Sequence, residues 1–217
     1  MTKIAIIGTA NHRSEAPYSD PSWTVWGVSP KNIGQIPRWD EWFELHDFDV
    51  VGDFGPELKA FLKTDHGKPV WMHKKYCTTY PVRPFDFDAM RKTFGEFFFT
   101  SSIAWMLAKA ILENPSEIGI WGVDMGHETE YRDQRAGCQH FISVARDRGI
   151  RVTLPPQSKL HARSRLYGLE GISAVEKDLR RRVSELKAIE KQSRRNADMQ
   201  LGALTVLEDI LRAEFPE

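Results

Sequence analysis

Short apolar runs alternate with helical segments along roughly the first 160 residues, and this alternation restricts the fold more than any other feature. The first run, KIAIIG at residues 3–8, is apolar after its lysine and ends in glycine, like a parallel strand buried on both faces. Six predicted strands lie at residues 3–8, 24–29, 42–47, 69–73, 117–125 and 151–155, with 50–53 as a turn or a continuation of the third. Predicted helices lie between them at residues 55–64, 87–95, 101–114 and 134–149. We therefore predict an α/β fold, a Rossmann-like mainly parallel sheet of about six strands with flanking helices.

The last fifty residues have a different pattern, so we place a domain boundary between residues 1–165 and 166–217. Apolar residues recur there at steps of three and four among Lys, Arg and Glu, on both sides of the polar segment QSRRNAD. This spacing predicts a C-terminal extension made of one long helix or a helical hairpin. The helices could fold back on the core, form a self-associating coiled coil or act as a binding module. We expect a homo-oligomer that assembles through them.

Composition narrows the class of protein. Lys plus Arg and Asp plus Glu number 30 each, and this balance argues against a protein whose whole surface binds nucleic acid. Cys77 and Cys138 are far apart and predict neither a disulfide framework nor a zinc site. With no apolar run of membrane-spanning length, we expect a cytoplasmic protein with no membrane association. Five tryptophans are expected to pack in the core or at its rim, at positions 23, 26, 39, 42 and 71.

Candidate ligand-binding residues follow the predicted strands, because ligands of open parallel sheets bind beyond the carboxyl ends of the strands. After the first strand, a glycine turn would let backbone N–H groups approach an anion, beside small polar side chains. The residues of this kind after the first two strands are Gly8, Thr9, Ala10, Asn11, Ser29 and Asn32. No GxGxxG motif is present, so a dinucleotide is poorly indicated.

A run of three hydroxyl residues, Thr100, Ser101 and Ser102, precedes the nearly charge-free helix at 101–114. Hydroxyl groups and the free N–H groups of a helix N-terminus suit a phosphate or a carboxylate. The alternative is that one hydroxyl simply caps the helix. The helix itself is apolar nearly all round, which predicts that it lies deep against the sheet.

Asp124 ends the fifth predicted strand at the same edge of the sheet. It could bind ribose hydroxyls, coordinate a divalent cation or act as a base, or it could only cap the next turn. The following segment, GHETEYRDQRAG, is dense in polar groups and is a candidate lid over a substrate. We assign catalytic candidates to Asp124, His127 and Glu128, and substrate contacts to Tyr131 and Arg135.

Three motifs together resemble known families: IIGTANHRSEAP, then VSPKN, then FTSSIAWMLAKAILENPSEIGIWGVDM. They resemble the Rossmann-like fold of bacterial sialyltransferases and of archaeal 6-hydroxymethylpterin diphosphokinase-like proteins. The stretch is also similar to uncharacterised proteins commonly carried by bacteriophages, several of them encoded near DNA-modification genes. This resemblance implies host cytoplasm as the location and nucleic acid as one acceptor.

The sialyltransferase resemblance implies a role for each matched position. Residues 8–11 would form the turn near the nucleotide, Asn32 would donate to the substrate, Ser101 and Ser102 would cradle a phosphate or a base, and Asp124 would be the acidic strand end. The turn departs from the family, because it reads G-T-A-N-H instead of G-N-G-P-S and lacks the second glycine. The catalytic histidine of the family has no matching motif, which leaves four histidines unassigned: His46, His73, His127 and His140.

These observations predict a group transferase, glycosyltransferase-like, with a nucleotide or nucleotide sugar as donor. One alternative is a phosphoryl or diphosphoryl transferase that uses ATP and Mg²⁺. Another is a protein that binds and sequesters a nucleotide without chemistry.

Overall fold

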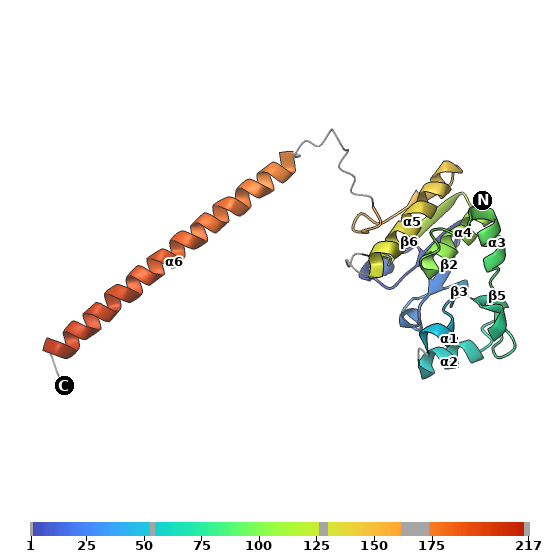
Figure 1. Ribbon diagram of the computed structural model, residues 1–217, viewed down its shortest axis with the longest axis horizontal. Helices are drawn as coiled ribbons and strands as arrows, with labels where there is room; N and C mark the ends of the chain where they lie inside the picture. Colours follow the sequence, from blue (N-terminus) through green and yellow to red (C-terminus); the bar gives the residue numbers. More distant parts are fainter. Residues whose placement is uncertain (1, 53–54, 126–129, 162–173, 215–217) are drawn as a thin grey trace. The chain divides into compact units, whose positions relative to one another are not determined.

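The computed structural model describes residues 2–52, 55–125, 130–161 and 174–214. The chain divides into two units, Met1–Ala162 and Arg163–Glu217, and each is described here by itself. The first unit contains an α/β sheet domain and the second contains one long helix (Figure 1).

A parallel sheet of seven strands forms the centre of the first unit, with the strand order β5-β4-β3-β2-β1-β6-β7. The strands are β1 (Lys3–Ile7), β2 (Trp23–Val28), β3 (Glu41–Phe43), β4 (Val70–Met72), β5 (Arg83–Pro84), β6 (Glu117–Trp121) and β7 (Arg151–Thr153). The α/β fold and six of the strands are confirmed. The two-residue strand β5 was not predicted, because a proline inside so short a segment gives no strand pattern.

Helices cover both faces of this sheet. They are α1 (Phe48–Val51), α2 (Pro56–Lys63), α3 (Phe87–Phe94), α4 (Ser102–Glu113) and α5 (Glu130–Asp147), with short 3-10 turns η1 (Asn11–Glu15), η2 (Pro30–Asn32) and η3 (Lys74–Tyr76). Successive strand residues point to opposite faces, so Ile4 and Ile6 pack with α3, α4 and α5, whereas Ala5 and Ile7 pack on the face that α2 covers.

The α4 helix lies deep in the first unit, as its sequence predicted. Seven of its residues are buried, from Ile103 to Ile111, and they contact the central strands. Ser101 is the N-cap, and its hydroxyl accepts a hydrogen bond from the Ala104 N–H at 3.2 Å. Asn114 ends the helix in a left-handed conformation with φ of 50°. The helix is therefore fixed at both ends, and its first turn points to the carboxyl edge of the sheet.

The third strand is shorter than predicted. It ends at Phe43, and residues 50–51 belong to the helix α1 rather than to a turn or a continued strand. The Asp47 carboxylate accepts the Asp49 N–H at 3.1 Å and caps this helix, which begins directly after it. The alternation of apolar and polar residues in 42–47 gave no sign of this cap.

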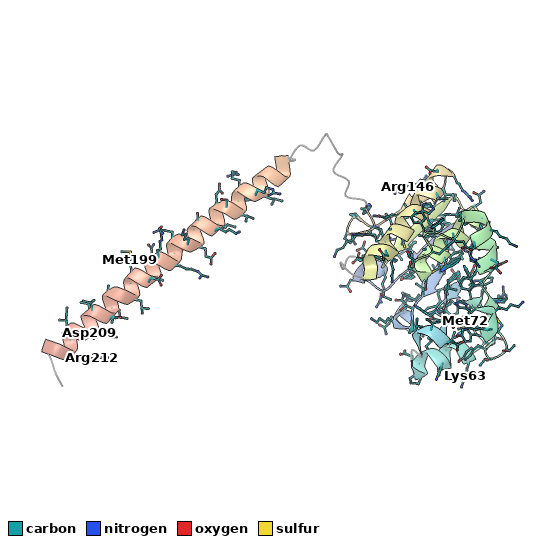
Figure 2. The ribbon with its side chains drawn as sticks, viewed as in Figure 1. Lys63, Met72, Arg146, Met199, Asp209 and Arg212 are labelled. Carbon is teal, nitrogen blue, oxygen red and sulfur yellow. The ribbon has the colours of Figure 1, made fainter. Side chains whose placement is uncertain are left out.

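The second unit contains a single uninterrupted helix, α6 (Ala174–Glu214), so the hairpin alternative is wrong. The polar segment at 192–198 has no proline or glycine and continues the helix with a hydrogen bond between Gln192 and Asn196, 3.0 Å. Apolar side chains along α6 are exposed: Met199 is 74% exposed, whereas Met72 in the first unit is fully buried (Figure 2). Among the described residues, no helix is both long and apolar enough to cross a membrane.

Candidate functional site

A cavity of about 780 Å³ lies at the carboxyl edge of the sheet, where β1, β2, β3 and β6 end. Its wall also includes residues of α1 and the first turn of α4. Seven of the residues predicted from the sequence line it: Gly8, Thr9, Ala10, Ser29, Ser101, Ser102 and Asp124. The structure thus brings the strand ends and the hydroxyl run together, as the parallel topology requires.

The ends of β1 and β6 approach each other closely at two glycines. A Cβ atom on Gly8 would lie 2.4 Å from the Gly122 oxygen, and one on Gly122, which has φ of 70°, would lie 2.5 Å from the Gly8 oxygen. The Gly8 N–H donates to Trp121 and the Ala10 N–H donates to Gly122, each at 2.8 Å. Both of these N–H groups join the strand ends and are not available to an anion.

Asp124 follows β6 and is held by a histidine that is 112 residues away in the sequence. Its Oδ1 lies 2.9 Å from His12 Nε2, and the Gly122 N–H donates to His12 Nδ1, also at 2.9 Å. Because Nδ1 accepts a hydrogen bond, the neutral ring carries its hydrogen on Nε2 and donates a hydrogen bond from it to Asp124. The His12 side chain is 5% exposed and that of Asp124 is 37% exposed. A fixed, buried donor therefore orients a carboxylate that faces the cavity.

No pattern in the sequence singled out His12. It lies in the 3-10 turn η1 after the first strand, in the quoted stretch TANHR, and no spacing linked it to Asp124. Only the parallel pairing of β1 with β6 brings the two residues together.

Asn32 and Asn11 do not line the cavity. The Asn32 amide donates to the carbonyls of Ile7, Gly8 and Val28 at 3.1, 3.0 and 2.8 Å, and the residue is fully buried. The expectation that Asn32 donates to a substrate is wrong, because backbone carbonyls use its amide. Asn11 is exposed at the start of η1.

The three hydroxyls before α4 have three different environments. Thr100 donates to the Asp133 carbonyl at 3.0 Å, and Ser101 is the cap described above. Ser102 is the first helical residue and lines the cavity. Ser101 also contacts the buried thiol of Cys138 at 3.6 Å, and burial raises the pKa of that thiol to about 12. Cys138 therefore remains a neutral thiol at neutral pH and is a poor nucleophile.

A histidine that follows β3 forms a second polar part of the wall, and it contacts a buried carboxylate. His46 Nδ1 lies 2.5 Å from Glu44 Oε1, and the Glu44 side chain is fully buried. The hydrogen bond that His46 donates to Glu44 raises the pKa of His46, against the opposing effect of burial. Of the other unassigned histidines, His73 contacts the Leu45 carbonyl and His140 stacks on Phe98, and neither lines the cavity.

Asp47, beside His46, holds the helix α1 in place at the cavity wall. Its carboxylate accepts hydrogen bonds from Lys75 at 2.5 Å and from the Tyr76 hydroxyl at 2.9 Å. The Lys75 hydrogen bond is the main reason that the pKa of Asp47 is lowered to about 2. Asp47 is thus an ionised structural anchor.

An aromatic pair forms the apolar part of the wall. Phe99 and Trp105 stack with ring centroids 3.8 Å apart and ring planes at 14°, and both line the cavity. None of the five tryptophans chosen from the sequence lines it, and their predicted packing in the core or at its rim is confirmed. Trp105 was overlooked because its helix reads as apolar nearly all round.

Two lining residues other than glycine have left-handed backbones, Ser29 with φ of 78° and Met125 with φ of 45°. Such conformations cost of order 1–3 kcal/mol and cluster at ligand sites, where the surrounding structure imposes them. Their position at two strand ends agrees with a binding site there.

The first four residues of the predicted lid, 126–129, lie outside the described residues, and the rest begin the helix α5. His127 and Glu128 are among the residues that are not described, and Tyr131 is described only by its backbone, in the first turn of α5. Arg135 lies farther along α5 and does not line the cavity, whereas Gln134 does. Within the described ranges, no group of three or more His, Cys, Asp or Glu residues is arranged to hold a metal ion.

Comparison with models of known protein families gives no match, and no curated protein sequence matches the chain. Solved structures do match. The sialyltransferase CstII from Campylobacter jejuni, in complex with the substrate analogue CMP-3FNeuAc, matches with a TM-score of 0.51 at 14% identity, over 74% of this chain and 83% of that chain. CstII with cytidine-5'-monophosphate gives 0.47 at 16% identity, over 79% and 84%. This chain thus has a fold similar to that of a sialyltransferase.

Proposed function

We propose that this chain is a group transferase, glycosyltransferase-like, that binds a nucleotide sugar in the cavity at the carboxyl edge of the sheet. The observation that carries the proposal is the pair of His12 and Asp124, in which a buried donor fixes a half-exposed carboxylate at the cavity wall. A carboxylate so oriented can accept the proton of an acceptor hydroxyl. As that hydroxyl oxygen bonds to the anomeric carbon of the sugar, the bond from this carbon to the nucleotide phosphate breaks, and the nucleotide leaves.

The rest of the cavity wall suits the other parts of such a donor. The stacked rings of Phe99 and Trp105 offer an apolar surface for a base or a sugar face. The Ser102 hydroxyl and the first turn of α4 offer donors to a phosphate. The fold adds support, because a sialyltransferase of similar fold was solved with the nucleotide-sugar analogue CMP-3FNeuAc.

Binding and turnover tests separate sugar transfer from the two alternatives, phosphoryl transfer and nucleotide sequestration. Calorimetry with CMP, a CMP-sugar, a UDP-sugar and ATP, each with and without Mg²⁺, identifies the nucleotide class. Mass spectrometry then detects transfer of the sugar or of a phosphoryl group. Sugar transfer supports the proposal, phosphoryl transfer from ATP supports the kinase-like alternative, and binding without turnover supports sequestration. A nucleic-acid acceptor remains a prediction from the phage resemblance, and adding single-stranded DNA to the CMP-sugar reaction tests it.

We also propose that the chain self-associates through α6. Six exposed residues share two positions of a single heptad register, three of them before and three after the polar segment at 192–198: Leu179, Val183, Leu186, Leu204, Leu207 and Leu211. An apolar seam with this spacing is typical of a coiled coil. Its central positions hold Glu190, Ser193, Ala197 and Gln200, so the apolar positions on both sides must offset the cost of polar and like-charged residues that face each other there.

A further inference from the structure

The cavity has an uneven distribution of charge. Among its described lining residues, Asp47 and Asp124 are acidic, and His46 is the single basic side chain. A ligand with a phosphate or carboxylate brings further negative charge, and desolvated charges need a partner of opposite sign. Neither Lys75 nor Arg13 is among the described lining residues, because Lys75 binds Asp47 and Arg13 donates to the Thr9 carbonyl and the Asn32 amide oxygen.

His46 is placed so that its protonated form is stabilised. Its Nδ1 contacts Glu44, whose side chain is fully buried and whose Oε2 has no hydrogen-bond partner among the described residues. A buried carboxylate without a counter-charge is costly, so Glu44 favours an imidazolium at its side. His46 is 37% exposed and lies between Glu44 and the cavity, so its positive charge is closer to a bound ligand than the negative charge of Glu44.

We propose that His46, held as an imidazolium by Glu44, binds the anionic group of the ligand. This inference rests on the proposed function, because it identifies the cationic contact of the nucleotide site. The group that His46 recognises is an oxyanion, which either a phosphate or a sugar carboxylate can supply. Anion affinity then requires the proton on His46, so it is strong at low pH and weakens as the pH rises through the pKa of His46.

The other charged groups near His46 do not replace it. Asp47 is paired with Lys75, and Asp124 accepts from His12 on the opposite part of the wall. His73 lies behind Leu45, with its Nε2 on the Leu45 carbonyl, and is absent from the described cavity wall. The direction of the pKa of His46 supports the geometry, since the Glu44 hydrogen bond raises it.

The test is a pH titration of the histidine ring resonances by NMR, with sodium sulfate or with sodium chloride at equal ionic strength. Sulfate keeps its charge across about pH 5 to 8, where histidines titrate. The variant His46→Gln assigns the resonance by its loss, and His66→Gln is a matched control, because His66 binds the Phe61 carbonyl away from the cavity. We expect sulfate to raise the pH at which His46 loses its proton and to leave His66 unchanged. An identical His46 titration in both salts overturns the inference and means that His46 and Glu44 form only a structural ion pair.

Calorimetry with CMP separates this inference from the proposed function. We expect CMP to bind about tenfold or more weakly to His46→Gln at pH 6, and to lose a similar factor in the parent protein between about pH 6 and pH 8.5, whereas His66→Gln should match the parent protein. If CMP binds equally to the parent protein and to His46→Gln at every pH, the role of His46 is refuted, but the proposed nucleotide site stands. If sulfate shifts the titration of His46 but no nucleotide binds, anion binding by His46 stands and the proposed nucleotide ligand is refuted.

Discussion

The Nε2 atom of His12 lies 2.9 Å from the Asp124 carboxylate, although 112 residues separate the two in the sequence. Gly122, two residues before Asp124, donates its N–H to the other ring nitrogen and so selects the tautomer that donates to the carboxylate. The histidine thus positions Asp124 without competing for the role of base.

Asp124→Asn should keep the fold and abolish most turnover. The Asn side chain keeps an oxygen that accepts from His12, so the free energy of unfolding should change little, but an amide cannot take the acceptor's proton. We expect sugar transfer to fall by a hundredfold or more, on the order of the loss of a positioned base, while CMP affinity is retained. Steady-state transfer rates and calorimetry check this. Full activity in this variant would reduce Asp124 to a capping residue and direct attention to His127 and Glu128.

Substitutions of the two serines at the start of α4 should have different effects, one on stability and the other on CMP binding. Ser101→Ala removes the cap on the Ala104 N–H and should cost about 0.5–2 kcal/mol of unfolding free energy with CMP affinity unchanged. Ser102→Ala should weaken CMP binding by roughly 1–3 kcal/mol, the range for hydrogen bonds to charged groups, with stability nearly unchanged. Urea unfolding and calorimetry on both variants provide the comparison. The reverse pattern would show that the helix start is not part of the ligand site.

The close approach of Gly8 and Gly122 should be intolerant of a methyl group. Gly122→Ala combines a left-handed backbone with a Cβ only 2.5 Å from a backbone oxygen, so we expect a loss of about 2–5 kcal/mol. Gly149→Ala is the matched control, because Gly149 has φ of 79° with open space around it and should lose only about 1–2 kcal/mol. All seven tryptophans lie in the first unit, so their fluorescence in urea reports its unfolding alone. Equal losses in both variants would mean that the two strand ends can separate without cost.

These positions show what the sequence could and could not predict. Apolar runs identified β1 and β6, and the parallel topology then placed Gly8, Ser102 and Asp124 around one cavity, because parallel strands end at the same edge. Such reasoning locates a site but does not say which donors are already used.

The sequence did not predict the partners of those residues. Asn32 carries the same amide whether it meets a ligand or the carbonyls of Ile7 and Gly8, and only the packed turn decides between them. His12 and Glu44 acquire their roles through contacts that no local pattern encodes. The same holds for Trp105, whose helix looks uniformly apolar until the sheet covers its other sides.

The His46 and Glu44 pair should make stability depend on pH. Because the pKa of His46 is raised above its ordinary value of 6.5, the pair contributes fully below about pH 6.5, and the contribution is lost as the pH rises through the folded-state pKa. We expect the unfolding free energy to decline over this range in the parent protein and to decline less in Glu44→Gln. Tryptophan-detected urea unfolding at several pH values measures both slopes. Identical slopes would mean that Glu44 does not hold the proton on His46.

Self-association through α6 should depend on the heptad seam. Leu207 lies on the seam and Val206 lies off it, with 60% and 58% exposure, so Leu207→Glu and Val206→Glu form a matched pair. Burying a leucine is worth about 1.5–3 kcal/mol, and each copy would lose this at Leu207. We expect multi-angle light scattering to show an oligomer for the parent chain and Val206→Glu, and a monomer for Leu207→Glu and for a chain ending at Glu170. Tryptophan fluorescence should report unchanged stability of the first unit. A monomeric parent chain, or equal behaviour of the two glutamate variants, would contradict assembly through this seam.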